Sequence, residues 1–72
     1  MKLLGQNDDQ VDVRLNIAEL VLVNNALEEI CHGFQLTDND FQEILGVHRA
    51  DAALLLRRVG QVLERLGVLA EN

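Results

Sequence analysis

The chain contains no proline, tryptophan, tyrosine or serine, a single cysteine and only two phenylalanines among its 72 residues. One cysteine excludes a disulfide within the chain, which is a common support for a core this small. The remaining nucleophiles of note are Cys31, Thr37 and Lys2. Cys31 falls on an expected core face, while the adjacent His32 is directed to a polar face. We therefore predict no catalytic residues and no enzymatic activity.

Long apolar runs are also absent. No stretch approaches the roughly 20 residues of a membrane-spanning helix, and the opening segment MKLLGQNDD is too short for a signal-peptide core. A lone cysteine is typical of a reducing compartment. These features predict a cytoplasmic protein that does not enter a membrane.

Basic residues are few, because 6 Lys and Arg side chains stand against 12 Asp and Glu side chains, for a net charge of −6. This balance opposes non-specific binding to nucleic acid, which depends on the neutralisation of phosphates by Lys and Arg. The only basic segment is 48–66, which contains four arginines, Arg49, Arg57, Arg58 and Arg65.

Metal ligands are sparse. On a helix the adjacent Cys31 and His32 point about 100° apart and cannot grip one ion from one face. Residues 38–40 are similar to the start of a calcium loop, but Glu43 and Arg49 stand where that loop needs glycine and glutamate. We predict no metal and no cofactor.

The dominant stretch is an amphipathic helix over 16–33. Asn16 followed by Glu19 is the capping-box pattern of a helix start, and Gly33 favours a helix end with positive φ. At about 100° per residue, one arc collects the expected core residues, Leu20, Val23, Ala26, Leu27, Ile30 and Cys31. The opposite side collects Asn24, Asn25, Glu28, Glu29 and His32.

Three apolar residues lie outside the expected core stripes. Val21 and Leu22 fall toward the polar side of the long helix, and Leu54 interrupts the polar side of the last helix. Exposed apolar neighbours on a small chain favour a second contact surface. These three residues are our candidate protein interface. For Asn24 and Asn25, contact with a loop backbone and contact with a partner both remain open.

The rest of the pattern predicts an α+β fold, in one domain over 1–72. Segments 1–5 and 11–15 are typical of a two-stranded β-hairpin, which we expect to cover the long helix and to leave a free edge. Thr37 or Asp38 caps a short helix over 38–45, whose inward residues are expected to be Phe41, Ile44 and Leu45. The last helix has an apolar stripe of Ala52, Leu55, Leu56, Val59, Val62, Leu63 and Leu66. The glycine at Gly60 indicates either a close helix crossing or simple tolerance.

Residues 45–58, LGVHRADAALLLRR, with Phe41 before them, resemble the turn and second helix of a helix-turn-helix. The resemblance implies DNA contacts by Arg49, Arg57 and Arg58. However, Gln42 replaces a small residue of the motif, and Ala53 and Leu54 would stand where base edges are read. A tight glycine turn between two packed helices explains the same residues without DNA.

A second resemblance covers more of the chain. The segment ELVLVNNALEEICHG, with Phe41 and Leu-Gly-Val downstream, is similar to a group of small bacterial proteins without assigned function. This resemblance implies a bacterial cytosolic origin and supplies no activity. From the residues we expect a protein-interaction or regulatory module that acts as a homodimer and contacts a protein partner. The alternative is a degenerate helix-turn-helix DNA-binding regulator.

Overall fold

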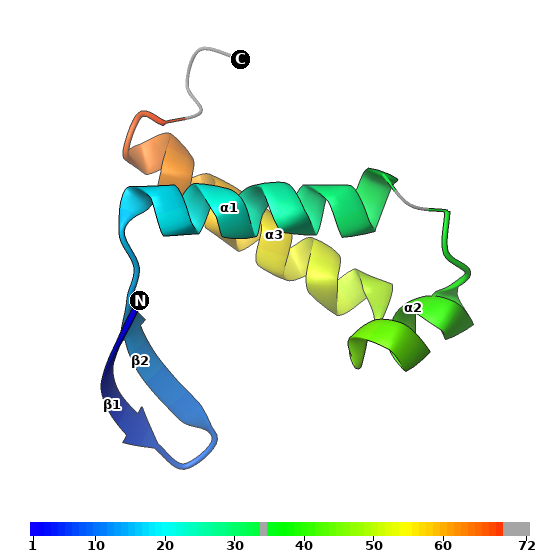
Figure 1. Cartoon of the computed structure of the whole chain (residues 1–72), viewed down its shortest axis with the longest axis horizontal. Coiled ribbons are helices and arrows are strands. Elements are labelled where there is room, and N and C mark those ends of the chain that lie inside the picture. The colour runs from blue at the N-terminus through cyan, green and yellow to red at the C-terminus, as the bar shows by residue number, and fades with distance from the viewer. Residues whose placement is uncertain (34, 69–72) are drawn as a thin grey trace.

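The computed structural model describes residues 1–33 and 35–68. A two-stranded antiparallel hairpin is followed by three helices, so the predicted α+β fold with long, short and long helices is confirmed (Figure 1). The elements are β1 (Lys2–Asn7), β2 (Gln10–Arg14), α1 (Ile17–Glu28), α2 (Asp38–Leu45) and α3 (Arg49–Arg65).

The hairpin turns at Asp8 and Asp9, where Asp8 has a left-handed φ of 53°. Aspartate tolerates this conformation better than most residues. Leu3 pairs with Val13 and Gln6 with Val11, and a bulge shifts the register between Leu3 and Gly5. The strands start and end within two residues of the predicted limits.

Helix α1 begins as its sequence predicts. The Asn16 side chain accepts a 2.7 Å hydrogen bond from the Glu19 backbone N–H, and the Glu19 carboxylate accepts a 2.9 Å bond from the Asn16 N–H. The predicted ending is wrong in its geometry. The chain continues from α1 into a π-helical turn (Glu29–Gly33), and Gly33 does not have a positive φ.

Helix α2 is bounded by two local signals. The Thr37 hydroxyl accepts a 3.1 Å hydrogen bond from the Asp40 N–H, and Gly46 ends the helix with φ of 78°. Phe41 is completely buried, as predicted. Ile44 and Leu45 were expected to point inward and are exposed, because Phe41 is the residue through which α2 joins the buried core. Leu36 and Phe34, in the connection before α2, are also expected from the sequence to anchor it. Leu36 packs on the core, and Phe34 lies outside the described residues.

The core lies between α1 and α3, which run in opposite directions and cross each other (Figure 1). Strands β1 and β2 contact none of the described helices and stand away from them, although Met1 just before β1 pairs with Glu19 of α1. The expectation that the hairpin covers α1 is therefore wrong. The molecule is consequently thin, with extents of 38 × 33 × 16 Å.

Candidate protein interface

The apolar stripe of α3 is divided into two halves. One half is buried against α1 and the rest of the core and consists of Ala52, Val59 and Leu63. The other half is open to solvent, with Leu55 50%, Val62 47% and Leu66 55% exposed. The apolar stripe of α3 is therefore wider than its contact with α1, and a second line of large aliphatic side chains on α3 has no cover among the described residues.

Helix α1 adds to this open line. Val23 is exposed although it lies in the arc that the periodicity assigns to the core. It comes one residue before the buried Asn24, as Val62 comes one residue before the buried Leu63. Both side chains are therefore rotated by about 100° in the same sense from the contact line between the helices.

When two antiparallel helices face each other, side chains rotated in the same sense from the contact line lie on the same side of the helix pair. Helices α1 and α3 are antiparallel (Figure 1). Val23 therefore lies on the side of the helix pair that carries the open half of the α3 stripe. We call this surface the helical face, made of Val23, Leu55, Val62 and Leu66.

The three residues that the sequence nominated do not join this face. Val21 is half-buried, whereas Leu22 and Leu54 are exposed. Leu22 lies about 160° around α1 from the buried Asn24, and Leu54 lies about 160° around α3 from the buried Ala52. Both point away from the helix–helix contact, on opposite outer surfaces of the pair. Periodicity had assigned the residues of the helical face to the core, so only the absence of a covering element identifies them.

The hairpin carries a second open apolar surface. Leu3, Val11 and Val13 lie on one face of the ribbon, because residues two apart share a face and Leu3 pairs with Val13. All three are exposed, as are all five residues of β2. We call this surface the hairpin face.

The total exposed area is large for the mass. The chain has 5811 Å² of accessible surface. A folded monomer of 8.1 kDa is expected to expose about 4,500 Å². The excess is therefore about 1,300 Å². The radius of gyration of 13.7 Å likewise exceeds the roughly 11 Å of a compact 72-residue domain.

The opposite side of the helix pair is polar. A groove there is lined by Asn24, Glu28, Leu56, Arg57, Gly60, Gln61 and Glu64. Asn24 was predicted on the exposed polar face and is buried instead, where it lies against Gly60 of α3 and donates a long, 3.5 Å hydrogen bond to Asn25. A Cβ at Gly60 would still lie 3.8 Å from Asn24 Oδ1, so the crossing has room for a small side chain as well as for the amide.

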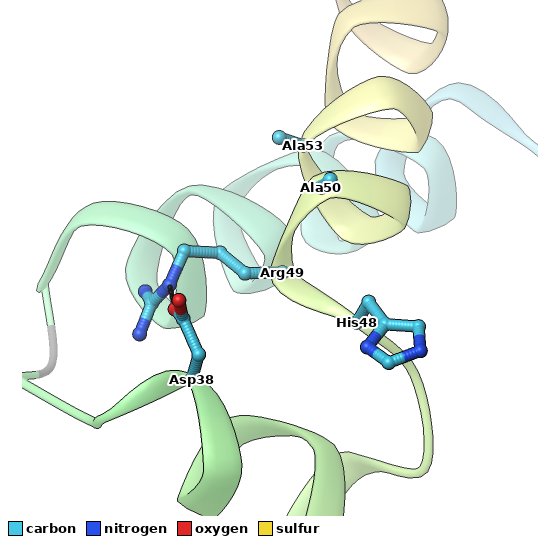
Figure 2. A pocket seen from close by; sticks show the side chains of 5 residues that line it. All are labelled: Asp38, His48, Arg49, Ala50 and Ala53. Atoms are coloured by element: carbon cyan, nitrogen blue, oxygen red, sulfur yellow. Dashed lines mark hydrogen bonds and ion pairs between the residues drawn. The ribbon is translucent and has the colours of Figure 1, made fainter.

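The three candidate DNA contacts differ in whether their side chains are already bound within the chain. Arg49 is occupied within the chain: its Nε donates to Asp38 at 3.1 Å, its Nη2 donates to the Leu36 carbonyl, and its guanidinium lies 4.7 Å from the Phe41 ring centroid. Figure 2 shows this guanidinium turned to the Asp38 carboxylate, in a shallow groove that Ala50 and Ala53 also line. Arg49 thus holds the 35–38 segment and α2 onto α3.

Arg57 and Arg58 are exposed. Neither belongs to an ion pair between described residues, which are formed by Met1 with Glu19, His32 with Glu28 and Arg49 with Asp38. Their charges are therefore available to a partner.

Glu19 fixes the junction of hairpin and helix. The Met1 ammonium donates to its carboxylate at 2.5 Å, and the Asn16 N–H donates to its other oxygen. These two donors, the ammonium first, hold the pKa of Glu19 below its ordinary value. The junction is short, since only Leu15 and Asn16 separate β2 from α1.

Among the described residues, no three His, Cys, Asp or Glu side chains gather closely enough to hold a metal ion. Cys31 is buried beside Phe41 and Ala52, in agreement with its predicted place in the core. No helix in the described part of the chain has the length and apolar character needed to span a membrane.

No protein-family model, curated protein or solved structure matches the chain. A function must therefore be inferred from the surfaces themselves.

Proposed function

We propose that the chain is a small cytosolic protein-interaction module that acts as a homodimer. The observation that carries this proposal is the helical face, four large aliphatic residues side by side in solvent on a chain with about 1,300 Å² of excess surface. A standard protein–protein interface buries about 800 Å² on each partner. The excess is sufficient for one such interface.

A second copy is the simplest partner for this surface. Domains generally bury their apolar faces between packed layers, whereas no described element covers the helical face. A two-fold dimer supplies a cover for this face from the same sequence, and closed two-fold dimers are the commonest oligomers. Leu22 and Leu54 point away from the helical face and remain free in such a dimer for a different protein.

DNA binding is the second candidate function. Its support is the arrangement of α2, the left-handed turn at Gly46 and α3, with Arg57 and Arg58 exposed. Against it, Arg49 is committed to Asp38 and Leu36, and the net charge is −6. These observations favour the interaction module.

Sedimentation equilibrium over a wide concentration range tests the proposal. We expect dimers for the wild-type chain and monomers for Val62→Lys, which places a charge in the helical face. Leu54→Lys is the matched control, because Leu54 lies on the same helix with a similar exposure of 41%. It should leave the dimer intact.

A wild-type chain that stays monomeric at every concentration contradicts the proposal. Equal weakening of the dimer by Val62→Lys and Leu54→Lys contradicts the assignment of the surface. The same experiment with duplex DNA at low salt tests the alternative, since phosphate contacts give binding that added salt reverses.

A further inference from the structure

We propose that the hairpin of each copy lies across the helical face of the other copy, so that the two chains exchange arms. This inference rests on the homodimer proposed above and names the surfaces that meet. Its starting point is the hairpin, which is formed although its strands contact none of the described helices. A two-stranded ribbon is at best marginally stable alone in water and needs another element against its apolar face.

The hairpin does not reach its own helical face. Only Leu15 and Asn16 join β2 to α1, and Asn16 is fixed as the N-cap by its two hydrogen bonds with Glu19. The Met1 ammonium on the same carboxylate ties β1 to the helix start as well. With both strands held at the junction, the ribbon points away from the helix pair (Figure 1).

The two open surfaces of the chain match in chemistry. The hairpin face offers Leu3, Val11 and Val13, and the helical face offers a line of valine and leucine side chains. Neither face has a cover among the described residues. A two-fold exchange covers both faces in both copies.

Charge complementarity indicates which end of the hairpin lies beside the arginines of the other copy's α3. Asp8 and Asp9 form the hairpin tip and Asp12 follows, so this end of the arm is acidic. On α3, Arg58 lies three residues after Leu55, and Arg65 lies three residues after Val62. Residues three apart on a helix are neighbours, so both arginines flank the helical face. An acidic tip beside this arginine rim places opposite charges together.

Pairwise cysteine cross-linking tests the exchange. Two chains of different mass are prepared, one with Val11→Cys in the hairpin and one with Val62→Cys on α3, and the mixture is oxidised mildly. We expect the mixed disulfide dimer to exceed either like-with-like dimer several-fold by mass spectrometry. Leu22→Cys replaces Val62→Cys in the control, because it is exposed on a helix but lies off the helical face. Wild-type protein reports any linkage through the buried Cys31.

The outcomes separate this inference from the homodimer itself. Predominance of the Val11→Cys dimer with itself shows hairpins paired edge to edge, and predominance of the Val62→Cys dimer with itself shows helical faces in direct contact. Either result overturns the arm exchange and leaves the homodimer standing. Equal mixed linkage by Leu22→Cys and Val62→Cys also overturns it. Monomers in sedimentation equilibrium overturn both proposals.

Discussion

Apolar side chains are buried at one end of the α1–α3 helix pair and exposed at the other. At the end where α1 finishes and α3 begins, Phe41 of α2 closes a small core with Cys31 and Ala52. At the other end, Ile17 at the start of α1 and Leu66 just after α3 are both more than half exposed. The sequence pattern is equally apolar at both ends. A third element, α2, is present at the first end and no described element takes its place at the second.

This difference indicates that the open end has well-formed local structure but no described element that covers its apolar residues. Its local structure is well specified, with a capping box at Asn16 and a C-terminal turn in which the Val68 N–H bonds back to the Leu63 carbonyl at 3.0 Å. A second copy that supplies its hairpin there plays the part that α2 plays at the closed end. The following predictions compare the two ends.

The largest effect is expected at the closed end. Phe41→Ala removes a completely buried ring and should lower the free energy of unfolding by about 3–5 kcal/mol. A domain of this length has a total stability of about 4–11 kcal/mol, so much of the chain should be unfolded. Urea denaturation followed by circular dichroism measures the loss.

The matched change at the open end is Val11→Ala, at a residue that is 59% exposed. In dilute solution, where monomers dominate, it should alter the free energy of unfolding by less than about 0.5 kcal/mol. At high concentration the cost should grow, because dimerisation adds to stability by mass action. A cost of Val11→Ala that is large and independent of concentration means that the monomer itself buries the hairpin face.

After Phe41→Ala, the next largest effect is expected for Arg49, which clamps α2 onto α3 at the closed end. Arg49→Met keeps much of the side-chain volume and removes the donors to Asp38 and to the Leu36 carbonyl, at an expected cost of about 1–2 kcal/mol. Arg49→Lys should recover little, because an ammonium cannot reproduce the planar donor fork or its stacking on Phe41. Arg57→Met, on the exposed side of the same helix, is the control and should be nearly neutral. Full recovery by lysine contradicts the geometric role.

Between the two ends, Gly60→Ala should stabilise the chain by about 0.5–1 kcal/mol through helix propensity. A Cβ at Gly60 meets Asn24 Oδ1 at 3.8 Å, an ordinary contact. The same substitution at Gly46, where φ is 78°, should destabilise by about 1 kcal/mol, because an L side chain is strained there. Thermal denaturation of both variants should move in opposite directions. A loss of stability for Gly60→Ala means that the crossing needs the glycine.

Most features that depend only on residues close in the sequence were predicted correctly, and several features that depend on distant parts of the chain were not. Caps and turns depend on neighbours within a few residues, so Asn16 with Glu19, Thr37 and Gly46 were placed correctly. Periodicity showed that α1 and α3 each have an apolar face, and they do pack together. Periodicity could not show that the contact with α1 would bury only half of the apolar stripe of α3.

The misplaced residues share one cause. Val23 was assigned to the core and Asn24 to the surface, yet the contact line of α1 passes through Asn24, which lies against Gly60 of α3. The hairpin was expected to cover α1, but the two-residue link and the Asn16 cap direct it outward. Such outcomes depend on which element lies opposite, and periodicity within one segment carries no information about that.

The smallest effect concerns the anchor of the open end and its dependence on pH. Glu19 has a pKa below its ordinary value of 4.5, held down by the Met1 ammonium and the Asn16 N–H. In the unfolded chain the carboxylate binds a proton near the ordinary value, while in the folded chain it stays ionised to lower pH. Its contribution to stability is therefore fully present above pH 4.5 and is lost as the pH falls through the lowered folded value.

Glu19→Gln isolates this contribution, because glutamine also completes a capping box but does not titrate. The other carboxyl groups are common to both chains, so the difference between their free energies of unfolding reports Glu19 alone. We expect wild type to be the more stable at neutral pH and the difference to shrink as the pH falls below 4.5. Measurements in dilute solution keep dimerisation out of the comparison. A difference that stays constant with pH shows that the Glu19 charge does not hold the hairpin junction.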